Sequence, residues 1–276
     1  MRIILNSENL NKLPEDTIYF HVASSDDNKN KKEYINNHIK NARFISFEDD
    51  LVGDIGIHGG RHPLPDMKKF SEKIMDFGVN GETPVLVYGK NSFTDASRLW
   101  WMLESIGIKN CHILYGTLDS YMYEGKTTES GEVLYTPSQK RDLSLNNNKL
   151  LNYEDVKSII HDDKYIIIDS RDSQRYEGLI DPVDNHPGHI PSAINKHYEE
   201  LLLGQNPPSI DDINNFFKDI DKDKNILLYC GSGVTAGANA IYLKEIGIEY
   251  YIYPGSYSDW ITYPGAIIEL GAYFGE

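Results

Sequence analysis

The residues best suited to carry chemistry lie in the stretch YCGSGVTAGANA, residues 229–240. Cys230 follows an apolar run and precedes a helical pattern, so we expect it at the junction of a strand and a helix. The positive end of a helix dipole and the free N–H groups of the first turn favour a thiolate over a thiol. Glycines at positions 231 and 233 allow successive amides to approach one anionic sulfur. The stretch therefore predicts a reactive thiolate at Cys230.

Other kinds of site share this strand, glycine loop and helix. Gly231, Gly233 and Gly237 resemble the glycines of a dinucleotide-binding turn, and Glu249 stands near the position of the acid that binds ribose. Two observations argue against a dinucleotide site. Glu249 lies at the start of its strand, whereas the acid that binds ribose lies at the end of one, and too few strands follow Glu249 to complete a nucleotide-binding fold. A cysteine phosphatase needs an arginine where this chain has Ala236. A non-catalytic binding module remains as the third alternative.

Composition limits the possible partners. The 276 residues suffice for two ordinary domains, and 40% of them are hydrophobic. The formal charge of −15 disfavours nucleic acid, because a phosphate backbone needs a basic face. No apolar run approaches the ~18 residues of a membrane span, and the N-terminal residues lack the apolar core of a secretory signal. We therefore expect a cytoplasmic protein that binds neither nucleic acid nor a membrane.

The chain has only two cysteines, Cys111 and Cys230. They form neither a disulfide framework nor a metal-ligand pattern. We expect no metal and no organic cofactor. Cys111 lies in the apolar run CHILY and is expected in a core strand. Any cysteine chemistry would therefore use Cys230 alone.

An internal repeat relates residues 85–121 to residues 226–260. Each copy has an apolar strand ending in Tyr, a glycine loop, a helix ending at Ile-Gly-Ile, a second strand and a glycine turn before an aromatic residue. Upstream, HIKNA at 38–42 resembles HIPSA at 189–193. Short apolar strands alternating with helices predict an α/β fold with a parallel sheet and helices on both faces.

We place the two domains at residues 1–140 and 150–276. The copies differ at the chemical position, where Gly89 in the first half matches Cys230 in the second. One nucleophile therefore remains, and we expect the first domain to help form the walls of its site.

Four motifs give the chain a resemblance to the two-domain rhodanese-type sulfurtransferases. In chain order they are GGRHPLP (59–65), DSRDSQRYEG (169–178), GHIPSAIN (188–195) and CGSGVTA (230–236). The resemblance covers nearly the whole chain and implies two tandem rhodanese-like domains. It also implies that Cys230 carries sulfur as a persulfide. The sulfur would come from a small anionic donor and pass to cyanide or to a thiol acceptor such as thioredoxin or a small thiol.

The resemblance assigns roles to residues around the cysteine. Arg175 is expected to bind the anionic end of the donor, since a guanidinium can grip a carboxylate or sulfonate at two points. The loop residues Gly231, Gly233, Val234 and Thr235 are expected to form the cradle for the bound sulfur.

A proton relay is the second role that the resemblance implies. Ser232, His62 and Asp50 are the residues that would protonate the leaving enolate of the donor. The alternative is that Ser232 and Thr235 only cap the helix that follows them.

The sequence gives conflicting indications about the donor. Gly231 and Ser232 carry no charge, which makes the loop similar to that of the 3-mercaptopyruvate sulfurtransferases; thiosulfate is the alternative donor. Mercaptopyruvate enzymes that this chain resembles have a second arginine at the position where it has Asp184.

A carboxylate at Asp184 would repel the donor if it pointed inward. Because its loop is polar and contains proline, we expect Asp184 to face solvent, with Arg61 or Arg171 supplying the second contact to the donor. The alternative for Arg171 is a scaffold role, paired with Asp169 or neighbouring acids.

Overall fold

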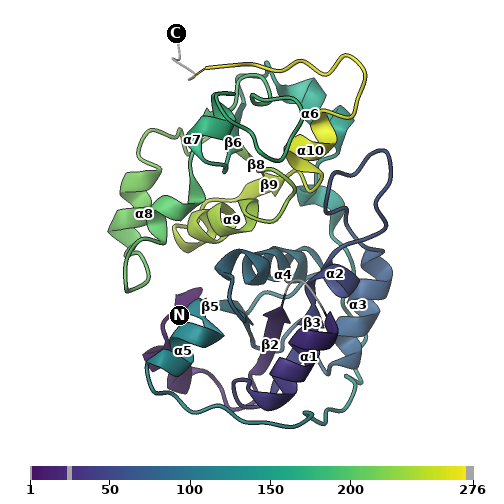
Figure 1. Ribbon diagram of the computed structural model, residues 1–276, viewed down its shortest axis with the longest axis vertical. Helices are drawn as coiled ribbons and strands as arrows, with labels where there is room; N and C mark the ends of the chain where they lie inside the picture. Colours follow the sequence, from purple (N-terminus) through teal and green to yellow (C-terminus); the bar gives the residue numbers. More distant parts are fainter. Residues whose placement is uncertain (1, 24–26, 272–276) are drawn as a thin grey trace. The chain divides into compact units, whose positions relative to one another are not determined.

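The chain forms two compact units in this structure, a computed structural model that describes residues 2–23 and 27–271 (Figure 1). The first unit comprises Met1–Gly53 and Pro65–Asn146, and the second comprises Asp54–Leu64 and Asn147–Glu276. Residues 54–64, which we expected in the first domain, thus pack with the second unit. Within the described residues, no helix combines the length and apolar character needed to cross a bilayer.

The first unit has a five-stranded parallel sheet in the order β1-β5-β4-β2-β3. Its strands are β1 (Ile4–Leu5), β2 (Ile18–Ala23), β3 (Ala42–Ser46), β4 (Val85–Gly89) and β5 (Cys111–Thr117). Its helices are η1 (Ser7–Lys12), α1 (Asp27–Asn36), α2 (Phe47–Leu51), α3 (Met67–Asp76), α4 (Phe93–Ser105) and α5 (Leu118–Tyr123). Helix α4 covers one face of the sheet, and α1 and α3 lie on the other (Figure 1).

The second unit has a four-stranded parallel sheet in the order β7-β6-β8-β9. Its strands are β6 (Tyr165–Asp169), β7 (Ile194–Asn195), β8 (Asn225–Tyr229) and β9 (Tyr250–Ile252). Its helices are η2 (Asn147–Lys149), α6 (Tyr153–Ile159), α7 (Ser173–Tyr176), η3 (Tyr198–Leu201), α8 (Ile210–Phe216), α9 (Ala236–Glu245) and α10 (Ser256–Trp260). Helix α9 lies on one face of this sheet, and α6 and α10 lie on the other (Figure 1).

The strand order is the same in both units. In the second unit, Leu150 forms a parallel bridge with Ile252 of β9, in the place where β1 pairs with β5 in the first. The remaining strands then correspond in chain order, from β2 with β6 to β5 with β9. The continuous apolar sequences of β4 and β8 fit strands that are buried on both faces of a parallel sheet.

A buried tyrosine fixes the corresponding turn in each unit. The Tyr88 hydroxyl accepts a hydrogen bond from the backbone N–H of Ile39, and the Tyr229 hydroxyl accepts one from Ile190. In the second unit, the ring of His189 stacks on Tyr176, and its Nδ1 lies 2.8 Å from the backbone oxygen of Tyr176. His189 thus fixes a turn through a hydrogen bond.

The same arrangement occurs in the first unit. There the His38 ring stacks on Tyr34, with its Nδ1 at 2.7 Å from the Tyr34 oxygen. Asn41 and Ser192 follow the two turns at matching positions, and both have a positive φ. The two units thus share equivalent hydrogen bonds at equivalent positions of the sequence repeat.

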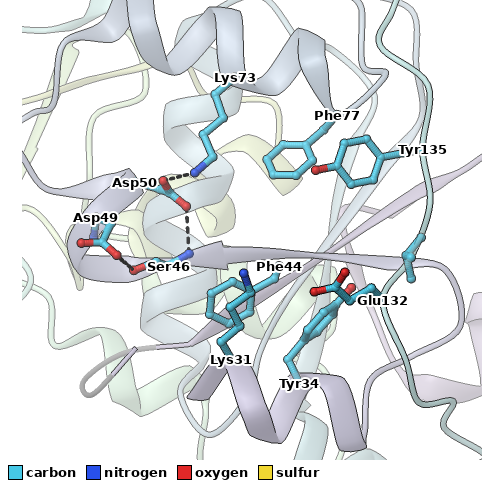
Figure 2. Close-up of a pocket in the computed structure, with 11 residues that line it drawn as sticks. Lys31, Tyr34, Phe44, Ser46, Asp49, Asp50, Lys73, Phe77, Glu132 and Tyr135 are labelled. Carbon is cyan, nitrogen blue, oxygen red and sulfur yellow. Dashed lines mark hydrogen bonds and ion pairs between the residues drawn. The ribbon is translucent and has the colours of Figure 1, made fainter. Parts of the chain in front are cut away.

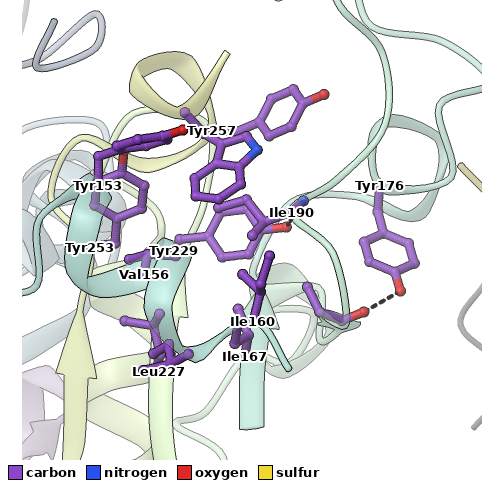
Figure 3. Close-up of a cluster of buried hydrophobic side chains, with 13 residues drawn as sticks. Tyr153, Val156, Ile160, Ile167, Tyr176, Ile190, Leu227, Tyr229, Tyr253 and Tyr257 are labelled. Carbon is purple, nitrogen blue, oxygen red and sulfur yellow. Dashed lines mark hydrogen bonds between the residues drawn. The ribbon is translucent and has the colours of Figure 1, made fainter. Parts of the chain in front are cut away.

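The core of the second unit surrounds Tyr229, the last residue of β8. Figure 3 shows tyrosines and aliphatic side chains gathered around Tyr229, whose neighbours include Ile190 and Leu227. Tyr229 is 0% exposed and ends the strand that leads directly into Cys230. Because interiors are close-packed, this ring fixes the point at which the chain leaves the sheet.

Gly89 occupies the position that Cys230 has in the second unit, and it leaves no room for a side chain. A Cβ atom at Gly89 would lie 1.8 Å from the backbone oxygen of Ser92. The loop after β4 is therefore tighter than the loop after β8. A nucleophile at this position would require the backbone to move.

We expect Gly89→Ala to lower the stability of the protein by about 1–3 kcal/mol, because the backbone must shift to relieve the contact with Ser92. Gly56→Ala serves as a matched control, since a Cβ at Gly56 meets its nearest atom at an ordinary 3.5 Å. Urea unfolding of both variants measures the difference. Equal midpoints would contradict the explanation for the missing nucleophile.

Candidate active site

Cys230 lies in a tight turn between β8 and α9. Its side chain is buried, and the backbone N–H of Gly233 donates a hydrogen bond to its Sγ at 3.2 Å. Gly233 has a φ of +76°, a conformation that glycine adopts without steric cost. The sulfur of Cys230 therefore lies just before the start of α9, with a backbone N–H pointing at it.

Helix α10 holds the carbonyl groups of this turn. The N–H of Tyr257 donates to the oxygen of Cys230 at 3.0 Å, and the N–H of Ser258 donates to that of Gly231 at 2.9 Å. The Ser256 hydroxyl accepts the N–H of Cys230 at 3.2 Å and lies 4.0 Å from its Sγ. We did not identify Ser256 and Ser258 from the sequence, although the glycine turn of the repeat in GSYSDW marks their segment.

Two guanidinium groups lie over Gly231. A Cβ atom at this glycine would lie 2.9 Å from Nη2 of Arg61 and 3.2 Å and 3.4 Å from Nη2 and Nη1 of Arg175. Gly231 therefore gives these guanidinium groups close access to the backbone next to Cys230. The structure thus brings Arg175 to the cysteine loop, together with Arg61, which we had considered only as an alternative contact.

The expectation that Asp184 faces solvent is wrong. Its side chain is 2% exposed and forms ion pairs with both arginines: one oxygen lies 2.8 Å from Nη2 of Arg175, and the other pairs with Nη1 of Arg61. Sequence reasoning failed here because a polar, proline-bearing loop is usually solvated, whereas this one carries its carboxylate inward.

Arg171 has a structural place behind these residues. It forms several hydrogen bonds with Asp169, the shortest 2.6 Å, and another with the backbone oxygen of Gly188 at 2.7 Å. Its guanidinium carbon lies 4.1 Å from the ring centroid of Tyr257. Burial opposes the charge of Arg171, but the Asp169 carboxylate outweighs this effect and raises its pKa. Arg171 thus has a structural role, paired with Asp169 and the backbone of Gly188.

Asp181 joins Arg171 to Arg175. Its two oxygens lie 3.4 Å from Nη1 of Arg171 and 3.2 Å from Nε of Arg175. Burial opposes ionisation of Asp181, but hydrogen bonds from the N–H groups of Asp184 and Val183, followed by the charge of Arg175, lower its pKa. Three arginines and three aspartates therefore form one continuous chain of ion pairs that ends at Arg61.

Residues 54–64 reach this site through contacts with α10 and the turn after it. The N–H of Gly59 donates to Oδ1 of Asp259 at 2.6 Å, and Nδ1 of His58 lies 2.7 Å from the Thr262 hydroxyl. The N–H of Arg61 donates to the Ser258 hydroxyl at 3.1 Å. These contacts explain why the segment packs with the second unit and not with its sequence neighbours.

The same segment places His62 beside Ser232. Nδ1 of His62 lies 2.8 Å from the Ser232 hydroxyl, within hydrogen-bonding distance. Ser232 thus contacts the predicted partner of the relay. Thr235 precedes α9 with a helical backbone, and its side chain makes no capping hydrogen bond. Val234 lies beside it, and its carbonyl accepts the N–H of Gly237 at 3.2 Å.

Asp50 belongs to the first unit. There its carboxylate accepts the N–H of Ser46 at 3.0 Å and pairs with Lys73, as Figure 2 shows. The carboxylate lines a cavity of about 560 Å³ whose aromatic walls include Phe44 and Phe77 (Figure 2). Membership of Asp50 in the relay stays a prediction.

Cys111 is a buried residue of β5, as the sequence indicated. Its backbone oxygen accepts the indole N–H of Trp100 at 2.9 Å, and burial raises the pKa of its thiol well above the usual value. Within residues 2–23 and 27–271, no group of three or more His, Cys, Asp or Glu side chains is arranged to hold a metal ion.

Comparison with known proteins shows which family the chain resembles. A model of the rhodanese-like domain matches residues 10–124 and 152–263, one match in each half of the chain. The matches confirm the resemblance that the four motifs indicated. They also confirm the predicted α/β fold with two tandem rhodanese-like domains.

Two curated relatives and one solved structure resemble most of the chain. The putative thiosulfate sulfurtransferase SseB of Mycobacterium tuberculosis is 30% identical over 256 residues, which is 84% of this chain and 82% of the relative. The 3-mercaptopyruvate sulfurtransferase of Escherichia coli is 29% identical over 238 residues, 83% of this chain and 82% of the relative. The crystal structure of SseA from Escherichia coli has a TM-score of 0.75 and 25% identity, covering 94% of this chain and 100% of that one.

We expect Asp181→Asn to destabilise the protein most above about pH 5 and progressively less toward pH 3. The lowered pKa means that the ionised carboxylate contributes stability above the ordinary aspartate pKa of about 3.9, and that this contribution is lost as the pH falls through the lowered value. Urea unfolding across this pH range tests it, with exposed Asp163→Asn as the control. A difference from wild type that does not depend on pH would refute the role assigned to Asp181.

Proposed function

The chain belongs to the rhodanese-like domain family, and we propose that this sulfurtransferase moves a sulfur atom from 3-mercaptopyruvate to a thiol through a persulfide on Cys230. The observation that carries the proposal is the cradle of Cys230, whose Sγ accepts the Gly233 N–H at 3.2 Å while two guanidinium groups lie over the next residue. Such a cradle suits a sulfur that is anionic as a nucleophile and again as a leaving group.

The first step forms the persulfide. The Cys230 thiolate attacks the sulfur of mercaptopyruvate, an S–S bond forms, and the C–S bond of the donor breaks. The electron pair of that bond leaves with carbon as the enolate of pyruvate. Arg175 and Arg61 bind the carboxylate of the donor near Gly231, so that its sulfur faces Sγ.

The enolate needs a proton to leave as pyruvate. The Ser232 hydroxyl donates it, and His62, at 2.8 Å from that hydroxyl, supplies its replacement. Asp50 is the predicted third member of this relay, and its carboxylate is already paired with Lys73. We therefore expect Asp50 to matter less to this step than His62 does.

The second step releases the sulfur. An acceptor thiolate or cyanide attacks the outer sulfur, the S–S bond breaks, and Cys230 leaves as a thiolate. Thioredoxin or a small thiol is the acceptor that we propose, and the cytoplasm is the compartment in which such thiols stay reduced.

Thiosulfate is the alternative donor. One curated relative has thiosulfate in its name and another has 3-mercaptopyruvate, so the relatives alone do not favour either. We favour mercaptopyruvate because Gly231 and Ser232 add no positive charge beside the cysteine, where departing sulfite would carry two negative charges.

We expect mercaptopyruvate to add one sulfur atom to the wild-type protein and none to Cys230→Ser, because Cys230 is the cysteine in the cradle. Cys111→Ala is the matched control and should still gain the sulfur. Intact-protein mass spectrometry, followed by peptide mapping, measures the addition. Sulfur found on Cys111 would overturn the assignment.

Kinetics with both donors tests the proposed substrate. At the same pH and acceptor concentration, kcat/KM should be higher for mercaptopyruvate than for thiosulfate. A higher value for thiosulfate would reject the donor and leave the persulfide step in place. No transfer from either donor would favour a non-catalytic binding module.

We expect Ser232→Ala and His62→Gln to lower kcat with mercaptopyruvate about 100-fold, a typical effect of losing a general acid. Transfer from thiosulfate should change little, because sulfite leaves without needing a proton. Steady-state kinetics with the two donors makes each variant its own control. Asp50→Asn should lower kcat less than His62→Gln does, and equal losses with both donors would argue against a proton relay.

A further inference from the structure

The carboxylate of Asp184 forms ion pairs with two arginines at once. One of its oxygens lies 2.8 Å from Nη2 of Arg175, and the other pairs with Nη1 of Arg61. The carboxylate is almost wholly buried, whereas the side chains of Arg175 and Arg61 are 18% and 33% exposed. A buried carboxylate bound at both oxygens is screened far less by salt than a surface ion pair.

The bridge leaves a terminal NH2 group of each guanidinium for a ligand. Within the described part of the chain, Nη1 of Arg175 and Nη2 of Arg61 have no hydrogen-bond partner. They lie 3.4 Å and 2.9 Å from the position of a Cβ atom at Gly231. Two unpaired NH2 groups therefore lie close to the residue that follows Cys230.

Asp184 also lowers the net positive charge around the two guanidinium groups. The ion-pair chain to which it belongs has three arginines and three aspartates, so the network is neutral as a whole. Each further negative charge that a ligand brings therefore meets guanidinium groups that are already largely compensated. Without the charge of Asp184 the network would carry one net positive charge.

We infer that Arg61 and Arg175 form one anion-binding subsite over Gly231, and that Asp184 makes this subsite select singly charged anions over doubly charged ones. The inference rests on the proposed function in that the bound anion is the donor. Coulomb energy scales with the charge of the ligand, so removing the negative charge of Asp184 favours a doubly charged anion about twice as much as a singly charged one. Asp184 is thus a specificity residue, which acts through the arginines.

Arg61 owes its place to contacts outside its own part of the sequence. Its N–H is held by Ser258, and Gly60 fits closely against α10, since a Cβ atom there would lie 2.4 Å from the oxygen of Gly255. Both contacts lie within the second unit. Arg61 is therefore held in place by its backbone as well as by Asp184.

The test measures binding of inert anions, so that it does not depend on turnover. In the Cys230→Ser protein at pH 7, pyruvate serves as the singly charged probe and sulfate as the doubly charged one, with dissociation constants from calorimetry or ligand-observed NMR. We expect Asp184→Asn to shift the ratio of the two constants toward sulfate by about tenfold or more, because one negative charge is lost beside the guanidinium groups. Asp184→Glu should restore most of the preference for pyruvate.

Arg61→Gln tests the same subsite by removing a positive charge instead of a negative one. It should therefore weaken both anions and shift the ratio away from sulfate. Because the two substitutions have opposite predicted signs, Arg61→Gln keeps the inference falsifiable even if Asp184→Asn does not fold.

Glu177→Gln is the matched control, since it removes one negative charge two residues after Arg175. Within the described residues, its side chain makes no hydrogen bond or ion pair. The ratio should change less than about twofold, because Glu177 is paired with neither Arg61 nor Arg175, and a charge outside the ion-pair network is screened more strongly.

An unchanged ratio in Asp184→Asn, or an equal shift in Glu177→Gln, would overturn the inference. Shifts of the same sign in Asp184→Asn and Arg61→Gln would do so as well. Failure of the proposed function looks different, because the predicted ratios would then appear in proteins that transfer no sulfur from either donor.

Discussion

The carbonyl groups of Cys230 and Gly231 point toward α10, where the N–H groups of Tyr257 and Ser258 bind them. Each hydrogen bond contributes only about 1 kcal/mol. Their main effect is directional, because a carbonyl turned toward the sulfur would place its negative end beside a thiolate. With these oxygens held away, the N–H of Gly233 can reach Sγ. The conformation of the turn therefore depends on the hydrogen bonds from α10.

The same helix gathers the rest of the site. Residues 54–64 bind α10 through the contacts of Gly59 with Asp259 and of Arg61 with Ser258. His62 is therefore placed by the element that also turns the Cys230 loop. The Cys230 loop, Arg61 and His62 are thus positioned together, and a shift of α10 would move all of them.

The repeat shows which parts of the scaffold are general and which are specific. Both units keep the buried tyrosine at the strand end, with its hydrogen bond to the N–H of an isoleucine. This arrangement positions a loop without providing chemistry. The difference lies in the next residue, where the backbone of Ser92 leaves no space for a side chain at Gly89. The glycine at this position of the first unit therefore fits the geometry of its loop.

The sequence by itself determined the fold class and the repeat, and it predicted Cys230 as the nucleophile. These follow from local patterns, since apolar runs, glycines and helix starts act within a few residues. It also placed Ser232 and His62 together, through resemblance. Only the tertiary structure decided that Asp184 is buried and that residues 54–64 belong to the second unit. Burial and ion pairing join side chains far apart in the chain, and no local pattern encodes whether a charged residue on a polar loop meets water or two arginines.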